Sequence, residues 1–319
     1  MTILRQKVPW LVFTVLAVSF LTFMLTSLLP GDPARQILGE QATPEAVDAV
    51  RDDLGLDDPL PIRYLNWLGA ALTGDLGSSY TTGQPVEQAI AERVPVTFQL
   101  GLMAVGIALV LAIPLGVISA YRSGGAADRV ITGGTFALLS VPNFMMAILL
   151  IYGFAVYFPI FPATGWTRFT EDPFGSLRSA FLPALSLAAV NLAVFSRLLR
   201  SDMIATLQED FVTMAEAKGL STKRILFRHA FRLSSFSLLT VVGIQLGAVI
   251  GGSVVVEQIF ALPGVGRLLY DSILQRDLLM VQGVVLVISV TYITVNFVVD
   301  LLYSYLDPRI RHGNARAAV

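Results

Sequence analysis

The residues that could carry out chemistry by themselves are sparse in this chain. It has no cysteine and two histidines, His229 and His312, so thiolate catalysis, disulfides and a zinc centre are effectively excluded. No glycine is followed by a lysine, so the chain lacks the G-x-x-x-x-G-K-[ST] phosphate-binding loop, and it offers no plausible Ser/His/Asp arrangement. The sequence therefore predicts that the chain is not an enzyme. If it takes part in active transport, the energy must come from another subunit.

The segment with the most varied chemistry is DFVTMAEAKGLSTKRILFRHAFR, residues 210–232, which mixes acids, bases and small residues between two long apolar runs. We expect a short amphipathic helix with Asp210, Phe211 and Met214 on one face, ended by Gly219 and followed by a second helix. An ATPase bound below could push on such a segment. The segment could equally lie on lipid headgroups, because an anionic leaflet attracts its bases. The residues alone leave both interpretations open.

The rest of the chain has the composition of a membrane protein. It is 55% hydrophobic and 14% charged with a mean hydropathy of +0.70, whereas soluble domains carry about a quarter charged residues. A spanning helix needs about 20 apolar residues. Runs without a charged residue that can hold a span occupy 8–31, 94–121, 130–167, 179–196, 233–256 and 278–299. The sequence therefore predicts an all-α polytopic membrane protein with six transmembrane helices.

Three of these runs need a comment. The first is longer than the roughly 7–15 apolar residues of a cleaved signal peptide, so we interpret it as an uncleaved span. The third contains Pro142-Asn143, which predicts a kink, and Pro159 and Pro162 are expected to end its helix. The fourth is the shortest and the weakest candidate.

The distribution of Lys and Arg between the loops predicts the orientation. The side that holds both termini has 14 bases and 7 acids, and the other side has 8 bases and 16 acids, which together make up the chain's 22 bases and 23 acids. This asymmetry places both termini in the cytoplasm. It places residues 210–232 there as well.

Residues 30–96 form the one sizeable external segment and carry 11 acids and 4 bases. Thr43-Pro44-Glu45 is typical of a helix start, Gly55 of a helix stop, and Ile62 to Leu72 has the spacing of a second, amphipathic helix. The segment is either a solvated loop or a docking or gating surface, and its composition does not decide between them. The predicted division is 1–29 (amino terminus and first span), 30–96 (external segment), 97–304 (spans two to six, with a cytoplasmic segment at 201–232) and 305–319 (cytoplasmic tail).

The predicted spans contain small and polar residues but no carboxylate at mid-span. Gly243, Gly247 and Gly251 share one helix face, which predicts close helix packing or, alternatively, a face that lines a path. Asn143 and Gln245 form interhelical hydrogen bonds or line a pathway. Intramembrane charges usually mark ion or proton paths, so their absence argues against a secondary carrier. A membrane enzyme would need clustered His, Asp or Ser near one membrane face, and none is found.

The charged segment resembles the permease signature of ATP-binding-cassette importers, a Glu-Ala-Ala start with a Gly four residues after the second Ala. Thr213 stands where many importers have Glu, and A-x-A-K-G-L at 215–220 is typical of the peptide-importer branch. Other motifs make nearly the whole chain similar to the first of the two permeases of dipeptide/oligopeptide importers. They are L-P-G-D-P at 29–33, L-G-L-D-x-P at 54–59, G-D-L-G-x-S at 74–79, S-V-P-N-F at 140–144, G-G-S-V-V-V-E-Q-I-F-A-L-P-G-V-G-R-L at 251–268, V-Q-G-V-V at 281–285 and L-D-P-R-I-R at 306–311.

The resemblance implies a type I importer permease in the bacterial plasma membrane that forms half of a path for di- or oligopeptides. The implied partners are a second homologous permease, two ATPases that hold ATP and Mg²⁺, and an external substrate-binding protein; this chain itself would hold no cofactor. Non-peptide substrates of the same family, such as nickel chelates, glutathione, haem or sugars, remain open, because the binding protein largely sets that choice. The residues implied to couple to the ATPase are Asp210, Phe211, Thr213, Met214, Ala215, Glu216, Ala217, Lys218 and Gly219. Those implied to face the binding protein are Asp32, Asp57, Asp58 and Asp75.

The chain departs from the family pattern at two places. Glu216 occupies a position that is often basic in this branch, and Leu233-Ser234-Ser235-Phe236 replaces the usual Asn and Pro after Arg232. These departures leave open how the coupling segment enters the fifth span.

Overall fold

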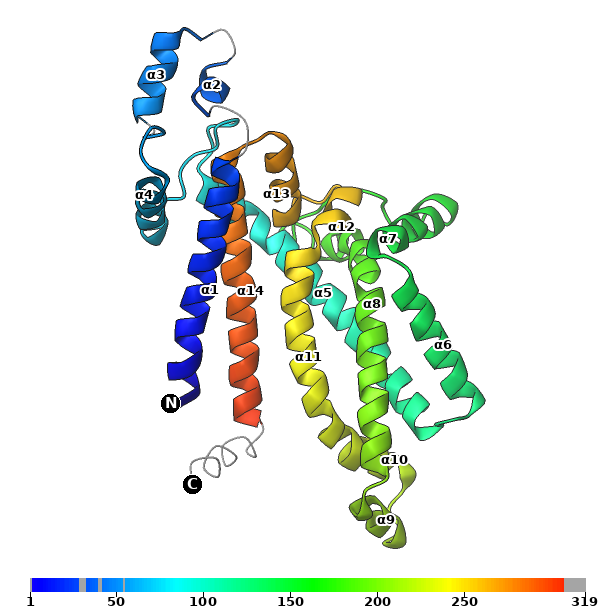
Figure 1. Ribbon diagram of the computed structural model, residues 1–319. Coiled ribbons are helices and arrows are strands. Elements are labelled where there is room, and N and C mark those ends of the chain that lie inside the picture. Colours follow the sequence, from blue (N-terminus) through cyan, green and yellow to red (C-terminus); the bar gives the residue numbers. More distant parts are fainter. Residues whose placement is uncertain (1, 29–32, 40–41, 54, 307–319) are drawn as a thin grey trace. The chain divides into compact units, whose positions relative to one another are not determined.

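The computed structural model describes residues 2–28, 33–39, 42–53 and 55–306, and Figure 1 shows them as a set of helices. Within these ranges there is no β-strand, and Ser78 and Pro85 form one isolated antiparallel bridge. The predicted all-α class is therefore confirmed.

Among the described residues, five helices are long and apolar enough to cross a membrane, and a bent pair supplies a sixth crossing when it is counted as one span. The five are Pro9–Ser27, Val86–Tyr121, Pro173–Leu207, Thr222–Gly252 and Leu278–Val299, and the bent pair is Ala126–Ser140 with Asn143–Tyr157. Each coincides with one of the six charge-free runs. The six predicted spans are confirmed on this count.

The third span is broken rather than gently kinked. Its two halves meet at 101°, and Val141 between them is extended, with φ −96° and ψ 117°. The cause is Pro142, which has no N–H to donate and disfavours helical backbone at the residue before it. Helix then resumes at Asn143 and ends at Tyr157, two residues before Pro159.

The chain divides into two compact units, Met1–Thr97 with Pro263–Ile293, and Phe98–Leu262 with Thr294–Val319. Two long helices, α5 (Val86–Tyr121) and α14 (Leu278–Leu306), contribute to both units. The division into four functional parts stays a prediction, because packing units need not coincide with functional parts.

The first unit has a core where the start of α5 meets the start of α14. Val86, Ile90, Leu268, Met280 and Val284 are buried there together. Gly283 permits this close approach, because a Cβ at that position would overlap the Val86 side chain. The remaining helices of the unit are α1 (Thr2–Ser27), α2 (Pro33–Leu38), α3 (Pro44–Asp53), α4 (Leu60–Leu72) and α13 (Val265–Leu274).

The predicted helices of the 30–96 segment are present. α3 begins at Pro44, with the Thr43 hydroxyl accepting from the Ala46 N–H at 3.4 Å, and Gly55 follows it with φ +60°. α4 is the predicted amphipathic helix. It is attached to α1 through Tyr64, whose hydroxyl lies 2.8 Å from that of Ser19.

The second unit is built around α8 (Pro173–Leu207), which packs against α6 (Ala126–Ser140), α7 (Asn143–Ile151) and α11 (Phe231–Gly252) (Figure 1). Phe195, Leu199 and Met203 of α8 are completely buried in its core. The most apolar stretch of α8 is 72% buried, against 17% for the first span. The fourth run was the weakest candidate because it is the shortest, but its helix extends beyond the flanking Arg178 and Arg197 on both sides. The other elements are η1 (Tyr152–Tyr157), α9 (Asp210–Ala217), α10 (Thr222–Arg224), η2 (Ile225–Ala230) and α12 (Val254–Ile259).

Candidate coupling site

The predicted helix of the charged segment is α9, and its end has a defined geometry. Gly219 follows it with φ +73°, a left-handed conformation that glycine adopts without strain. The Gly219 N–H donates to the Glu216 carbonyl at 2.8 Å, and the Leu220 N–H donates to the Ala215 carbonyl at 3.2 Å. This is the Schellman arrangement, which satisfies the last carbonyls of the helix. The predicted stop at Gly219 is therefore confirmed.

One face of α9 is buried against the chain that follows it. Val212 and Ala215 form a small cluster with Ile225 of η2, and Leu207 and Leu220 pack at its edge. Ala215, which was predicted to take part in coupling, is only 7% exposed, because it packs between α9 and η2. These contacts fix the direction of α9 relative to η2.

The opposite face of α9 is open and carries two large apolar side chains. Phe211 is 36% exposed and Met214 is 58% exposed. They are three residues apart, so they lie on the same side of the helix, as predicted. Around them are further exposed predicted coupling residues, namely Asp210, Thr213, Glu216, Ala217 and Lys218. A short helix with this surface can place an apolar knob in a groove of a partner protein.

After a short turn at residues 218–221, the chain enters the fifth span. α10, η2 and α11 form one helical stretch from Thr222 to Gly252. The substituted residues 233–236 lie inside it. Ser234 is buried there, and its hydroxyl lies 3.2 Å from that of Thr206 on α8. A displacement of α9 would therefore reach α11 through the packing of Val212 and Ala215 on Ile225, which lies in this stretch.

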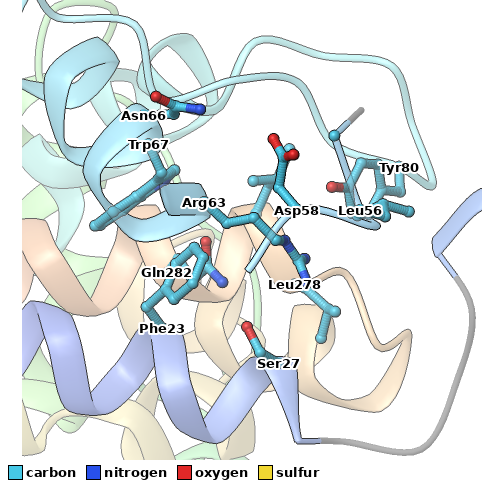
Figure 2. A pocket seen from close by; sticks show the side chains of 12 residues that line it. Phe23, Ser27, Leu56, Asp58, Arg63, Asn66, Trp67, Tyr80, Leu278 and Gln282 are labelled. Carbon is cyan, nitrogen blue, oxygen red and sulfur yellow. The ribbon is translucent and has the colours of Figure 1, made fainter. Parts of the chain in front are cut away.

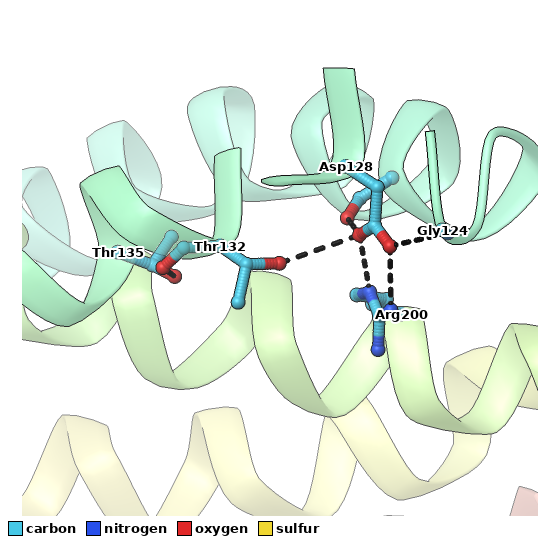
Figure 3. Close-up of polar contacts among 6 residues, drawn as sticks. Gly124, Asp128, Thr132, Thr135 and Arg200 are labelled. Atoms are coloured by element: carbon cyan, nitrogen blue, oxygen red, sulfur yellow. Dashed lines mark hydrogen bonds and ion pairs between the residues drawn. The ribbon is translucent and has the colours of Figure 1, made fainter. Parts of the chain in front are cut away.

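An ion pair near the end of α8 also holds this region in place, and the sequence did not predict it. Arg200 donates from Nε and from a terminal nitrogen to the two carboxylate oxygens of Asp128, at 2.6 and 2.7 Å. Figure 3 shows that Asp128 also accepts from the Gly124 N–H at 2.8 Å and from the Thr132 hydroxyl at 3.3 Å. The Ser119 hydroxyl of α5 donates as well, at 2.5 Å. This network joins α5, α6 and α8 just before the coupling segment begins.

From the sequence, Asp128 and Arg200 were counted only among the charged residues between the predicted spans. They lie 72 positions apart, and no local spacing rule relates them. The signal that could have found them is that each is a charge at the border of an apolar run.

The three glycines of the fifth span have different surroundings. Gly243 lies against α14, where an added Cβ would overlap the side chain of Val299. Gly247 is buried and Gly251 is half-buried. Close helix packing is thus seen directly at Gly243. Whether the other two serve packing or a path stays a prediction.

The polar side chains of the spans also differ from one another. Asn143 begins α7, and its side-chain oxygen is buried without a hydrogen-bond partner, while Gln245 is half-buried on α11. Gln99 of α5 donates to the Ser176 hydroxyl of α8 at 2.9 Å, an interhelical hydrogen bond. Glu257 lies on α12 and is completely buried, and it accepts from the Ser253 hydroxyl at 2.7 Å.

Three of the four acids predicted to face a binding protein are described, and their surroundings differ. Asp57 pairs with Arg51 at 3.6 Å, and Asp75 accepts from the Gly77 N–H at 2.9 Å in a turn. Asp58 lines a cavity of the first unit. Asp32 lies outside the described residues. Their role in docking stays a prediction.

The described residues thus form a helical membrane protein in which a short exposed helix packs against the start of one span. Residues 112–312 match the family of binding-protein-dependent transport system inner membrane components, and residues 1–101 match the amino-terminal region of such membrane components. These two matches cover most of the chain. The chain belongs to this family, as its motifs predicted.

Individual relatives extend over nearly the whole chain. A protein of Brucella abortus (strain 2308), provisionally named a peptide transport system permease protein, is 43% identical over 97% of this chain and 99% of its own length. The glutathione transport system permease protein GsiC of Pectobacterium atrosepticum is 38% identical over 96% of this chain and 98% of its own length. The oligopeptide transport system permease protein AppB of Bacillus subtilis (strain 168) is 36% identical over 93% of this chain and 95% of its own length.

Proposed function

We propose that this chain is a permease subunit of an ATP-driven peptide importer and forms half of its translocation path. The observation that carries the proposal is α9, which is held by Val212 and Ala215 on one face and exposes Phe211 and Met214 on the other. Its packing on Ile225, which lies in the helical stretch Thr222–Gly252, supplies a route by which motion of a bound ATPase reaches the spans. The names of the relatives support peptides as the substrate class.

The proposed complex contains a second homologous permease, two cytoplasmic ATPases that bind ATP and Mg²⁺, and an external binding protein that delivers the substrate. Both termini and α9 then lie on the cytoplasmic side, which agrees with the excess of Lys and Arg there. Closure of the ATPases would shift α9 and move the permeases between inward- and outward-facing states. This chain contributes no hydrolytic chemistry of its own.

A glutathione substrate is the alternative, because one relative, GsiC, is named for glutathione transport and is 38% identical to this chain. Relatives at 42–43% identity are named for peptide transport, so peptides remain the main proposal. Glutathione is itself a small peptide, so the two interpretations differ in substrate length and linkage rather than in mechanism. The binding protein that accompanies this chain would decide between them.

The test begins with gentle extraction of the tagged chain from its native membrane, followed by identification of what accompanies it. Phe211→Ala and Met214→Ala should then lower the amount of co-purified ATPase and the peptide-stimulated ATP hydrolysis. Phe174→Ala is the matched control, because its ring is 77% exposed at the start of α8, far along that helix from α9. A chain that purifies without any ATPase, or variants that retain full hydrolysis and uptake, would contradict the proposal.

A further inference from the structure

The first unit contains a cavity that coupling to an ATPase does not use. Its volume is about 210 Å³, far larger than the roughly 10–15 Å³ that one water molecule requires. Helices α1, α4 and α14 and the chain near residues 55 and 80 form its walls. Figure 2 shows the side chains that matter here, which are Phe23, Asp58, Arg63, Trp67, Tyr80 and Gln282.

Two opposite charges, Arg63 and Asp58, line this cavity and form no salt bridge with each other. Arg63 is half-buried and forms no ion pair with any residue in the described ranges, although its guanidinium carbon lies 5.9 Å from the centre of the Phe23 ring. Asp58 is exposed, and within the same ranges it too has no ion-pair partner. A half-buried cation without a counterion attracts an anion, because burial weakens the screening by water.

Two buried polar groups at the cavity also lack partners. Gln282 is 5% exposed; its amide nitrogen donates to the Thr26 hydroxyl at 2.6 Å, but its side-chain oxygen accepts nothing from the described residues. The indole N–H of Trp67 has no acceptor there either. Both atoms have almost no accessible surface, so a ligand in the cavity would be held by the charged side chains rather than by these two atoms.

The remaining walls are aromatic. The rings of Phe23 and Trp67 lie 5.9 Å apart between their centres, and Tyr80 lines the cavity as well. Burial raises the pKa of the Tyr80 hydroxyl, an effect that Arg63 opposes and Asp277 reinforces, so this hydroxyl stays a donor at neutral pH. Aromatic faces accept an ammonium group and also cover the apolar part of a small ligand.

We propose that this cavity binds a small zwitterion that carries a carboxylate and an ammonium group, with the carboxylate at Arg63 and the ammonium at Asp58. A free α-amino acid and a dipeptide share this chemistry. The site lies apart in sequence from α9, and binding there does not require that the transported substrate be a peptide. It would let the permease respond to small zwitterions through a site separate from its coupling segment.

The experiment uses Trp67 as its own reporter. Trp10→Phe and Trp166→Phe leave Trp67 as the one remaining tryptophan of the full chain. The purified chain in detergent is titrated with L-alanyl-L-alanine, with L-alanine, and with the uncharged N-acetyl-L-alanine amide. We expect a saturable change in Trp67 fluorescence with one or both zwitterions and none with the uncharged compound. A response to both, or to one of them, supports the site and identifies the source of the ligand.

Two variants and a control test the assignment of the charges. Arg63→Gln should weaken apparent affinity for the zwitterion roughly tenfold or more, as expected for loss of a charge-assisted hydrogen bond. Asp58→Asn, at an exposed position where misfolding is not expected, should weaken it less. Asp57→Asn is the matched control, because Asp57 is the adjacent acid, pairs with Arg51 and does not line the cavity.

Three outcomes would overturn the proposal. They are no saturable response at millimolar zwitterion, an equal response to the uncharged compound, and an affinity that Asp58→Asn leaves unchanged. None of them bears on the proposed importer function, because that function is measured by co-purified ATPase and by uptake. Conversely, a chain without an ATPase partner could still bind the zwitterion.

Discussion

Arg200 of α8 donates two parallel hydrogen bonds to the carboxylate of Asp128 on α6, at 2.6 and 2.7 Å. Asp128 is 4% exposed, and it also accepts from Gly124 and Ser119. Two-point pairing of this kind fixes orientation as well as distance. It holds the amino-terminal end of α6 against α8 about two turns before α8 ends and the coupling segment begins.

Loss of this pair should destabilise the second unit. Asp128→Asn removes the charge and one acceptor, and we expect the free energy of unfolding to fall by roughly 2 kcal/mol, because hydrogen bonds to charged groups contribute about 1.5–3 kcal/mol. Thermal unfolding in detergent measures this change. The matched control is Glu171→Gln, since Glu171 pairs with Arg168 at 3.9 Å on the exposed surface and should contribute less than about 1 kcal/mol. Equal effects of the two substitutions would contradict the anchoring role of Asp128.

Gly219→Pro should uncouple transport. Proline fixes φ near −65°, whereas Gly219 has φ +73° and uses its N–H to close the end of α9. Uptake should fall while the chain still inserts in the membrane. Gly219→Ala should lower uptake less. A Cβ there meets nothing within 4 Å, so alanine strains only the left-handed backbone, which costs about 1–2 kcal/mol. Normal uptake by the proline variant would count against a coupling role for α9.

Gly243→Ala should destabilise the contact between α11 and α14. The added methyl group would overlap Val299, and inserting a methylene-sized group into a well-packed contact costs about 1–3 kcal/mol. Val299→Ala should restore much of the lost stability in the double variant. Gly106→Ala on α5 is the control: a Cβ there meets nothing within 4 Å, so alanine should be neutral or slightly stabilising. A Gly243 variant that behaves like the Gly106 variant would refute the close approach.

For Gly247→Leu, predicted from the glycine spacing alone, we expect disrupted packing of the fifth span.

Asp277→Ala should loosen the first unit. The Asp277 carboxylate accepts from the Ser79 hydroxyl and, at 3.3 Å, from the Met280 N–H in the first turn of α14. It is therefore both a helix cap and a link to the chain near Ser79, and its loss should cost roughly 1–2 kcal/mol. Measured by thermal unfolding, Asp277→Asn should cost less, because asparagine can still cap. An alanine variant as stable as the parent would show that neither contact matters.

The sequence predicted the elements of this protein well because their signals are local. Six charge-free runs predicted the crossings, and Thr43 and Gly219 predicted a helix start and a stop from the backbone preferences of single residues. Pro142 predicted a kink, which the structure shows to be a break of 101°. The motifs predicted the family for a related reason, since they keep their order along nearly the whole chain.

What the sequence could not supply is which distant residues meet. Nothing in its periodicity pairs Asp128 with Arg200, or places Asp58, Arg63 and Gln282 around one cavity. It grouped four acids as one docking set, yet of the three described here Asp57 pairs with Arg51, Asp58 lines the cavity and Asp75 stabilises a turn.

The amino-acid sequence by itself determined where helices form, where they stop and which of them are apolar enough to cross a membrane. These properties depend on propensities and hydropathy within a few turns of chain. The tertiary structure alone decided which face of α9 is buried, which glycine admits a neighbouring helix and which charges find partners. Those outcomes depend on contacts between residues tens to hundreds of positions apart, and they are settled by packing and by the cost of leaving buried polar groups unpaired.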